Sequence, residues 1–248
     1  MTAAAPDGPL NVLELFAGIG GLSLGLQRAG MRIVGHVEIN PYCRAVLHKH
    51  WPEVPSHDDV RTAIAWWRST DRPRVDVVAG GYPCQGESLL GHRRGADDPR
   101  WLWPVMADVI ADLRPRYVIG ENVLGHRTRG LATVLTDLRR MRYTARAGVV
   151  RACAMGAAHP RARLFVLAHA QSSGRPPRCL DPRNDRPQTA DPQERPQPHR
   201  RDRWPTEPRM GRVADGVPAR VDRLAALGNA VVPAVAEHIG RLITHETR

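Results

Sequence analysis

The sequence contains almost no lysine, few cysteines and no long hydrophobic run. Lys49 is the only lysine among 36 Lys and Arg residues, so arginine carries nearly all of the positive charge. The four cysteines form no CxxC pair, which argues against a zinc ribbon or a redox motif, and we expect no metal site. No run of about 18 apolar residues occurs, so we expect no membrane span. The opening MTAAAPDGPL lacks the basic and apolar parts of a signal peptide, and we therefore expect a protein of the reducing cytoplasm.

The balance of charge is strongly positive. The 248 residues fit one mid-sized domain, or one domain with a small addition, and carry a formal net charge of +11. Such a surplus attracts anionic partners, nucleic acid among them. A GC-rich genome is the alternative explanation, because it favours arginine codons, but it does not account for the shortage of acidic residues. Charge by itself therefore leaves a nucleic-acid partner open.

Short apolar runs alternate with stretches of helical spacing. The first run, residues 10–16, ends at a glycine cluster, and the stretch after it has apolar residues at helical spacing up to Gly30. This alternation predicts a doubly wound, mostly parallel α/β sheet with helices on both faces. The other expected strands are 32–37, 75–79, 117–119, 147–150 and 164–168, and the other expected helices are 103–113, 131–141 and one or two from Val221 onward.

The composition changes near residue 171. Residues 171–210 hold nine of the 22 prolines and nine arginines, and their large apolar side chains are only Leu180, Trp204 and Met210. Such a segment buries too little surface to offset its chain entropy, so we expect a loop or a segment ordered by a ligand. We therefore divide the chain into a main α/β domain over 1–170, a short Pro/Arg-rich region over 171–215 and a helical segment over 216–248 that returns to the main domain.

A glycine-rich turn follows the first expected strand. The letters FAGIGG, residues 16–21, allow the backbone to turn tightly and to approach a ligand closely. Glu38 follows at the end of the second expected strand, where a carboxylate binds ribose hydroxyls. The pattern indicates a nucleotide-like cofactor without choosing between NAD and S-adenosylmethionine, and a plain tight turn is the structural alternative.

A cysteine occupies a second turn at the same edge of the sheet. Cys84 lies in GGYPCQGES, directly after the strand expected at 75–79. A thiolate is a strong nucleophile and forms at neutral pH when positive charge is near, and His92, Arg93 and Arg94 follow closely. A lone cysteine is ordinarily a small buried hydrophobe, but its place on a turn favours the nucleophile.

Two further groups complete this edge. Glu121 ends the strand expected at 117–119, so its carboxylate would point toward Cys84. Arg161 and Arg163 precede the strand expected at 164–168 and lie on one side of it by the two-residue alternation of strands. A thiol, a carboxyl able to hold a proton and paired guanidinium groups suit attack on an electron-poor heterocycle within a phosphate chain.

Together these motifs resemble those of DNA (cytosine-5) methyltransferases. The matching segments are ELFAGIGGLSLG, VEIN, Asp59-Val60, GGYPCQGES with GHRRGADDPRWLW, ENV, HPRARLF and LGNAVVP, spread over residues 13–233. PCQ followed by ENV and RxR is highly specific, whereas the glycine loop alone is not. The chain departs from the family pattern at Tyr82, where proline is frequent, at Glu87, where phenylalanine is usual, and at His159, where glutamine is usual.

The resemblance implies a Rossmann-like methyltransferase sheet with a small, irregular target-recognition region in 171–215. It implies that Cys84 is the nucleophile, that Glu121 holds cytosine N3, that Arg163 contacts the cytosine carbonyl, and that Arg161 helps to position this group and the neighbouring phosphate. S-adenosylmethionine would be held by Phe16, Gly18, Gly20, Gly21 and Leu22 around the pocket, Glu38 on the ribose, Ile39, Asp59 and Val60 around the adenine, Pro83 and Leu102 beside them, and Asn229, Ala230 and Val231 over the methionine end.

The implied reaction transfers a methyl group to C5 of cytosine in double-stranded DNA, through a Cys84 adduct on a flipped base, and yields S-adenosylhomocysteine. We expect a monomer, with a cognate restriction endonuclease as a further partner. Three alternatives stay open: an RNA cytosine methyltransferase, an inactive DNA-binding relative, and an NAD-dependent dehydrogenase. The last shares the glycine loop and Glu38 but gives no reason for PCQ followed by ENV.

Overall fold

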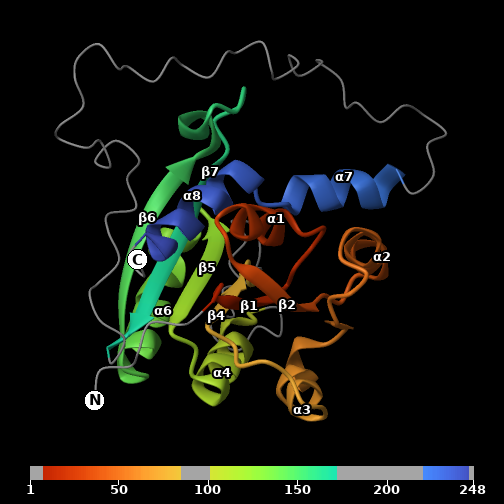
Figure 1. Ribbon diagram of the computed structural model, residues 1–248. Helices are drawn as coiled ribbons and strands as arrows, with labels where there is room; N and C mark the ends of the chain where they lie inside the picture. The colour runs from red at the N-terminus through yellow and green to blue at the C-terminus, as the bar shows by residue number, and fades with distance from the viewer. Residues whose placement is uncertain (1–7, 85–100, 172–219, 246–248) are drawn as a thin grey trace.

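A seven-stranded sheet forms the centre of the protein (Figure 1). The structure is a computed structural model that describes residues 8–84, 101–171 and 220–245. The strand order is β3-β2-β1-β4-β5-β7-β6, so the chain crosses over between β3 and β4 and again between β5 and β6. The strands are β1 (Asn11–Leu15), β2 (Arg32–Val37), β3 (Ser56–His57), β4 (Val77–Gly80), β5 (Tyr117–Val123), β6 (Tyr143–Arg151) and β7 (Ala162–Ala170).

Most neighbouring strands run parallel. β1 pairs in parallel with β2 and β4, and β4 pairs in parallel with β5, so the carboxyl ends of these strands meet at one edge. β1 and β4 are buried almost throughout, as parallel strands covered on both faces are. Only β7 opposes this direction, because it runs antiparallel to both β5 and β6. The predicted doubly wound, mostly parallel α/β sheet is confirmed.

Helices cover both faces of the sheet. Figure 1 shows α1 and α8 on one side of the strands and α3 and α4 on the other. Leu26 and Ile239 belong to the core on the first side, and Trp67, Met106 and Leu138 belong to the core on the second. The helices are α1 (Gly21–Arg28), α2 (Pro41–His50), α3 (Ala63–Arg68), α4 (Trp103–Leu113), α5 (His126–Arg129), α6 (Leu131–Arg140), α7 (Arg220–Asn229) and α8 (Pro233–Thr244), with 3-10 turns at Val60–Thr62 and Ala152–Met155.

The C-terminal helix packs closely against the first helix. A Cβ atom at Gly25 of α1 would lie 2.7 Å from Glu237 N of α8, and one at Gly240 would lie 2.6 Å from Ala29 Cβ. Side chains at these glycines would push the two helices apart. Their absence lets α8 lie directly on α1, which brings the turn between α7 and α8 to the carboxyl edge of the sheet.

Several elements differ from the sequence expectation. β5 continues to Val123 instead of ending at residue 119, because β7 pairs with it along its whole length, with Glu121 opposite Phe165. Glu121 therefore lies within a strand and not beyond its end. α2 and α3 are additional helices, and the start of α2 carries a readable signal: the Asn40 side chain accepts hydrogen bonds from Tyr42 N and Cys43 N.

Parts of the expected organisation fall outside the described residues. The Pro/Arg-rich region, 171–215, is described only at Gln171, so its proposed role in target recognition stays a prediction. α7 and α8 confirm the helices expected from Val221 onward. Within the described ranges, every helix is too short or too polar to cross a membrane.

Candidate active site

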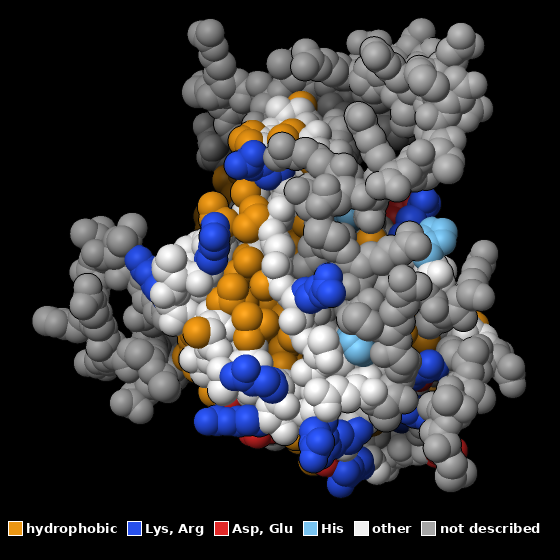
Figure 2. Space-filling view, turned by 90° about the vertical axis from the view of Figure 1, so that its left-hand side faces the viewer, with side chains coloured by type: hydrophobic (Ala, Val, Ile, Leu, Met, Phe, Trp, Pro, Cys, Tyr) orange, Lys and Arg blue, Asp and Glu red, His pale blue; other side chains and the backbone are white. Residues whose placement is uncertain are grey.

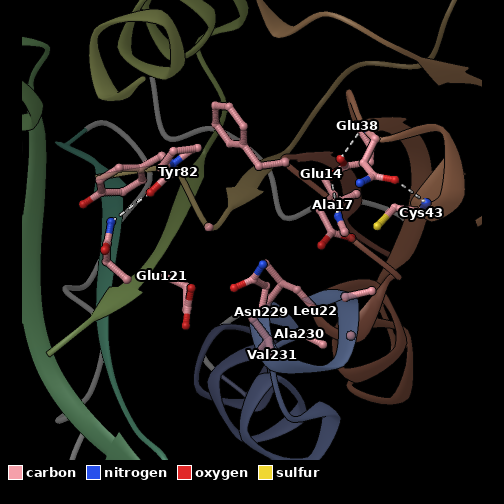
Figure 3. A pocket seen from close by; sticks show the side chains of 18 of the residues that line it. Glu14, Ala17, Leu22, Glu38, Cys43, Tyr82, Glu121, Asn229, Ala230 and Val231 are labelled. Carbon is pink, nitrogen blue, oxygen red and sulfur yellow. Dashed lines mark hydrogen bonds between the residues drawn. The ribbon is translucent and has the colours of Figure 1, made fainter. Parts of the chain in front are cut away.

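A cavity of about 440 Å³ opens at the carboxyl edge of the sheet. Three parts of the chain form its walls: the ends of β1 and β2, the ends of β4 and β5, and the turn between α7 and α8 (Figure 3). Most of the predicted site residues line it, which brings together positions far apart in the sequence. They are Phe16, Gly18, Gly21, Leu22, Glu38, Pro83, Cys84, Glu121, Arg163, Asn229, Ala230 and Val231.

The glycine-rich turn after β1 has an unusual backbone. Phe16 has a φ of 56°, Gly18 of 55° and Gly20 of 81°, and a positive φ is rare for a residue other than glycine. Gly21 begins α1 directly beneath the α7–α8 turn, and a Cβ atom there would collide with the carbonyl oxygen of Val231. The backbone of the glycine-rich turn therefore lines one side of the cavity. The α7–α8 turn, which contacts Gly21, lines the other side.

Glu38 braces this turn from the end of β2. Its Oε2 accepts a hydrogen bond from Gly18 N at 2.7 Å, and its Oε1 accepts one from Asn40 N at 2.8 Å. A carboxylate oxygen has more than one acceptor site, so both oxygens can still accept from a ligand hydroxyl. Glu38 is thus fixed in orientation on the cavity wall, which is what selective binding of a diol requires.

Cys84 lies just beyond β4 and lines the same cavity as Glu38. Its backbone forms an isolated antiparallel bridge with Trp101, and its side chain is half-buried at the cavity. The expected helpers His92, Arg93 and Arg94, together with Glu87, lie outside the described residues. Cys84 therefore lies at the cavity and not in the core, and its role as nucleophile stays a prediction.

Glu121 lies across the cavity edge from Cys84 and is 8% exposed. Burial raises its pKa to about 7, and the charges of Arg163 and Arg161 oppose this rise. The Arg163 Nε atom lies 3.0 Å from Glu121 Oε1. A Cβ atom at Gly81 would lie 2.9 Å from Glu121 Oε2, so this glycine leaves room for the carboxyl group. Near neutral pH the group can therefore both hold and release a proton.

Arg161 does not line the cavity. Its Nη2 atom donates to Gly228 O at 2.7 Å and to Ala230 O at 2.6 Å, which ties the start of β7 to the α7–α8 turn. It remains close enough to Glu121 to lower that group's pKa. The expected contact of Arg161 with substrate stays a prediction, but in this structure its guanidinium holds protein carbonyls.

Five other predicted residues lie beside the cavity and not on its walls. Ile39 is 69% exposed. Asp59 accepts from Arg61 N at 2.9 Å and caps the following 3-10 turn, whereas Val60 is buried in the core. Leu102 N donates to Pro83 O, and Gly20 packs against the Trp51 ring. Their assigned contacts with a cofactor stay predictions.

The cavity also contains residues to which the sequence reasoning gave no role. Glu14 lies within the matched letters ELFAG; it accepts a hydrogen bond from the Ser23 hydroxyl, and that hydroxyl lies 2.9 Å from His36 Nε2. Burial raises the pKa of Glu14 to about 8 and lowers that of His36 to about 4. Both side chains are therefore mainly uncharged at neutral pH. The further additions are Ala17, Asn40, Cys43, Gly81, Tyr82, Asn122, Val123, Ala225 and Ala226.

Fold and cavity together define a Rossmann-like α/β protein with a thiol and a carboxyl group at the carboxyl edge of its sheet. The sequence model of C-5 cytosine-specific DNA methylases matches residues 10–213. The chain belongs to this family. Among the described residues, no group of three or more His, Cys, Asp or Glu side chains is arranged to hold a metal ion.

Curated relatives and solved structures agree with this assignment. The chain is 34% identical over 168 residues to the type II methyltransferase M.Eco47II of Escherichia coli, covering 64% of this chain and 39% of that protein. It is 39% identical over 121 residues to M.XorII of Xanthomonas oryzae, covering 46% and 28%. A DNA modification methyltransferase encoded within an E. coli prophage superposes with a TM-score of 0.56 at 28% identity, covering 66% of this chain and 47% of that one. S. pombe Dnmt2, at 24% identity and a TM-score of 0.55, shares the fold. The chain thus spans less than half the length of the curated relatives it matches here.

Proposed function

We propose that this protein transfers a methyl group from S-adenosylmethionine to C5 of cytosine in double-stranded DNA. The observation that carries the proposal is that Cys84, Glu121 and Arg163 line the same cavity as the glycine-rich turn and Glu38. Family membership supports the same reaction, and the names of type II relatives suggest a cognate restriction endonuclease as a further partner. DNA as the substrate would place the enzyme in the compartment that holds the DNA.

The cavity residues fit the cofactor. Glu38 is oriented by two backbone amides and would accept from the ribose hydroxyls, and Phe16 and Gly18 would lie against the nucleoside. Asn229 and Val231 would close over the methionine end, directly above Gly21. S-adenosylmethionine would supply a methyl group on a positively charged sulfur.

The nucleophile acts on the base. Cytosine C5 is too weak a nucleophile to accept a methyl group directly, so addition of the Cys84 thiolate at C6 would first convert C5 into an enamine carbon. C5 would then take the methyl group as the S–CH3 bond breaks and S-adenosylhomocysteine forms. Water would accept the C5 proton, and the thiolate would leave as the C5–C6 double bond re-forms. The half-buried position of Cys84 at the cavity supports this role.

Glu121 and Arg163 would stabilise the charge that develops during the addition. Electron density moves onto N3 and the carbonyl oxygen when the thiolate adds, so a proton from Glu121 to N3 and a hydrogen bond from Arg163 to the carbonyl lower the barrier. The pKa of Glu121, about 7, suits transfer in either direction at neutral pH. A stacked base cannot reach this cavity, so the cytosine must rotate out of the duplex.

One experiment tests this proposal. The protein is incubated with tritiated S-adenosylmethionine and either duplex DNA or RNA, and the product is sequenced for 5-methylcytosine. Label in DNA at a fixed sequence context supports the proposal, whereas label only in RNA would reassign the substrate. Cofactor binding without any transfer would identify a binding module. Cys84→Ala is the matched control: it removes transfer and leaves cofactor affinity unchanged, since the sulfur acts only in the covalent step.

A further inference from the structure

Tyr82 departs from the family pattern two residues before Cys84. The resemblance gives proline as the frequent residue here, and a proline ring fixes the backbone φ of its own residue. Tyrosine cannot do this, and Pro83 restrains only its own φ, so the position of residue 82 depends on the contacts of its side chain and main chain. Tyr82 is 2% exposed. The centroid of its ring lies 5.2 Å from that of Trp103 and 5.3 Å from that of His126.

A buried hydrogen bond joins Tyr82 to His126. The phenolic oxygen lies 3.0 Å from His126 Nε2, across 44 residues of sequence. His126 begins α5, just after β5, and burial lowers its pKa to about 4, so the ring is neutral. A bond between two neutral groups deep in the protein fixes the direction of both rings, since neither can turn to water for a partner.

The backbone of the same segment is anchored to the same neighbour. Asn122 Nδ2 donates to Tyr82 O at 2.9 Å, and Asn122 Oδ1 accepts from Val123 N at 2.9 Å. Trp101 forms the isolated β-bridge with Cys84, and the centroid of its ring lies 5.5 Å from that of His126. The main chain of Tyr82 is thus attached to β5, the strand that carries Glu121, and its side chain is attached to α5, which follows β5.

We infer that Tyr82 and His126 form a positioning pair that sets the place of the Cys84 thiol relative to Glu121. The two side chains do not contact the reacting atoms in this proposal. They act through the backbone of residues 82–84. The inference rests on the proposed function, because it concerns how the proposed nucleophile, Cys84, is positioned. It assigns to this chain a side-chain restraint where the family pattern has a proline ring.

The test uses Tyr82→Phe with Tyr143→Phe as its matched control. Tyr143 is equally buried, and its hydroxyl donates to Pro115 O at 2.7 Å at the opposite end of the sheet. Both variants lose one buried hydroxyl, so both lower the melting temperature to a similar extent. Tyr82→Phe lowers kcat for methyl transfer to DNA by about 10- to 100-fold, the scale for a misplaced reacting group. The KM for S-adenosylmethionine stays within about twofold of wild type, and Tyr143→Phe changes neither parameter.

His126 variants separate the hydrogen bond from packing. His126→Phe keeps a ring but removes the nitrogen that pairs with the Tyr82 hydroxyl, and it lowers kcat as Tyr82→Phe does. His126→Gln can place an amide near the former Nε2 position and restores most of the rate. Because the two side chains act as one unit, the double variant with Phe at both positions is no slower than either single variant.

A second readout does not depend on turnover. Iodoacetamide labels Cys84 faster in Tyr82→Phe than in wild type, measured on its peptide relative to the exposed Cys153, because the segment is less restrained. If the wild type transfers no methyl group, the proposed function fails and the labelling rate alone decides the pair. If Tyr82→Phe matches Tyr143→Phe in both kcat and Cys84 labelling, the positioning pair is refuted.

Discussion

Two buried carboxyl groups, those of Glu121 and Glu14, line the cavity and are raised in pKa for the same reason, the loss of water around the charged form. Their partners differ. Glu121 faces two guanidinium groups, which hold its pKa at about 7, whereas Glu14 has the Ser23 hydroxyl and reaches about 8. At neutral pH the first group is poised to exchange a proton and the second is mainly neutral.

Glu121→Gln tests the proton transfer. The amide retains the shape of the carboxyl group but cannot give up a proton, so we expect kcat to fall by about 10²- to 10⁴-fold with little change in cofactor affinity. Ionisation of the Cys84 thiol raises the rate of addition with pH in both proteins, whereas the wild type also loses the Glu121 proton above about pH 7. Rapid-quench measurements of addition from pH 6 to pH 9 should therefore show the ratio of the wild-type rate to the variant rate falling above about pH 7. A ratio that does not change with pH would exclude Glu121 as the proton donor.

Glu14 couples the stability of the fold to pH. Its folded pKa of about 8 lies above the unfolded value of 4.5, so its contribution to stability is present at low pH and is lost as the pH rises toward 8. The buried histidines, with pKa values lowered to about 4, act in the opposite direction only below about 6.5. We therefore expect the free energy of unfolding to fall by about 1–2 kcal/mol from Glu14 alone between pH 6.5 and pH 8.

Urea unfolding at these two pH values measures this effect. Glu14→Gln should remove most of the fall, since the amide carries no titrating proton. Glu53→Gln, on the surface, is the control and should retain the wild-type fall. If the free energy of unfolding falls equally in Glu14→Gln and in the wild type, a group other than Glu14 causes the fall.

Three candidate site residues meet at one cavity because they lie within short motifs at strand ends. Cys84, Glu38 and Glu121 were each read from letters next to a predicted strand, and all three line the cavity. The hydrogen bond between Tyr82 and His126 was not foreseeable, because it depends on how two loops pack across the sheet edge. A pattern in one sequence carries no information about such contacts.

At the scale of elements, Arg161 links the start of β7 to the α7–α8 turn. Arg161→Ala removes its hydrogen bonds to Gly228 O and Ala230 O, so the turn is held less firmly over the cavity. Hydrogen bonds from a charged group contribute about 1.5–3 kcal/mol each, and we expect the Kd for S-adenosylmethionine to rise by about tenfold or more. Calorimetric titration measures this change.

Arg241→Ala is the control on the same helical unit. Arg241 is exposed on α8 and, among the described residues, pairs with Glu237 of its own helix, so its loss should leave the cofactor Kd unchanged. Equal weakening by both substitutions would show that general loss of positive charge, and not the hold on the turn, is responsible.

The expected elements occur in the expected order, but only some of them have the expected length. β2 and α4 were expected at their observed bounds, because a local apolar pattern ends at a clear stop. β5 and β6 are longer than expected, since pairing with β7 extends the ladder through residues that are weakly apolar or polar. Strand length in this part of the sheet is set by partners distant in sequence.

At the scale of the whole molecule, arginine dominates the surface charge. Figure 2 shows one side of the protein, where Lys and Arg side chains surround a hydrophobic area and few acidic side chains appear. The net charge of +11 predicts binding to duplex DNA that weakens steeply with salt, because each neutralised phosphate releases counterions.

Fluorescence anisotropy with a labelled duplex measures this dependence. With about six phosphate contacts, we expect the affinity to fall by about a thousandfold between about 50 and 200 mM NaCl. Binding of S-adenosylmethionine, measured in the same buffers, should vary far less. Duplex binding that is insensitive to salt would show that the surplus of arginine is a matter of codon usage alone.

Arg161 can couple the affinities of the protein for its two proposed ligands, the cofactor and the extruded base. Its guanidinium holds Gly228 O and Ala230 O beside the α7–α8 turn and lies within electrostatic reach of Glu121. If an incoming base draws the guanidinium toward itself, the hydrogen bonds to the α7–α8 turn weaken. If the base shifts the guanidinium toward the turn, these hydrogen bonds strengthen. Thermodynamic linkage makes the exchange reciprocal, so cofactor must change the affinity for the extruded base by the same factor, with the same sign.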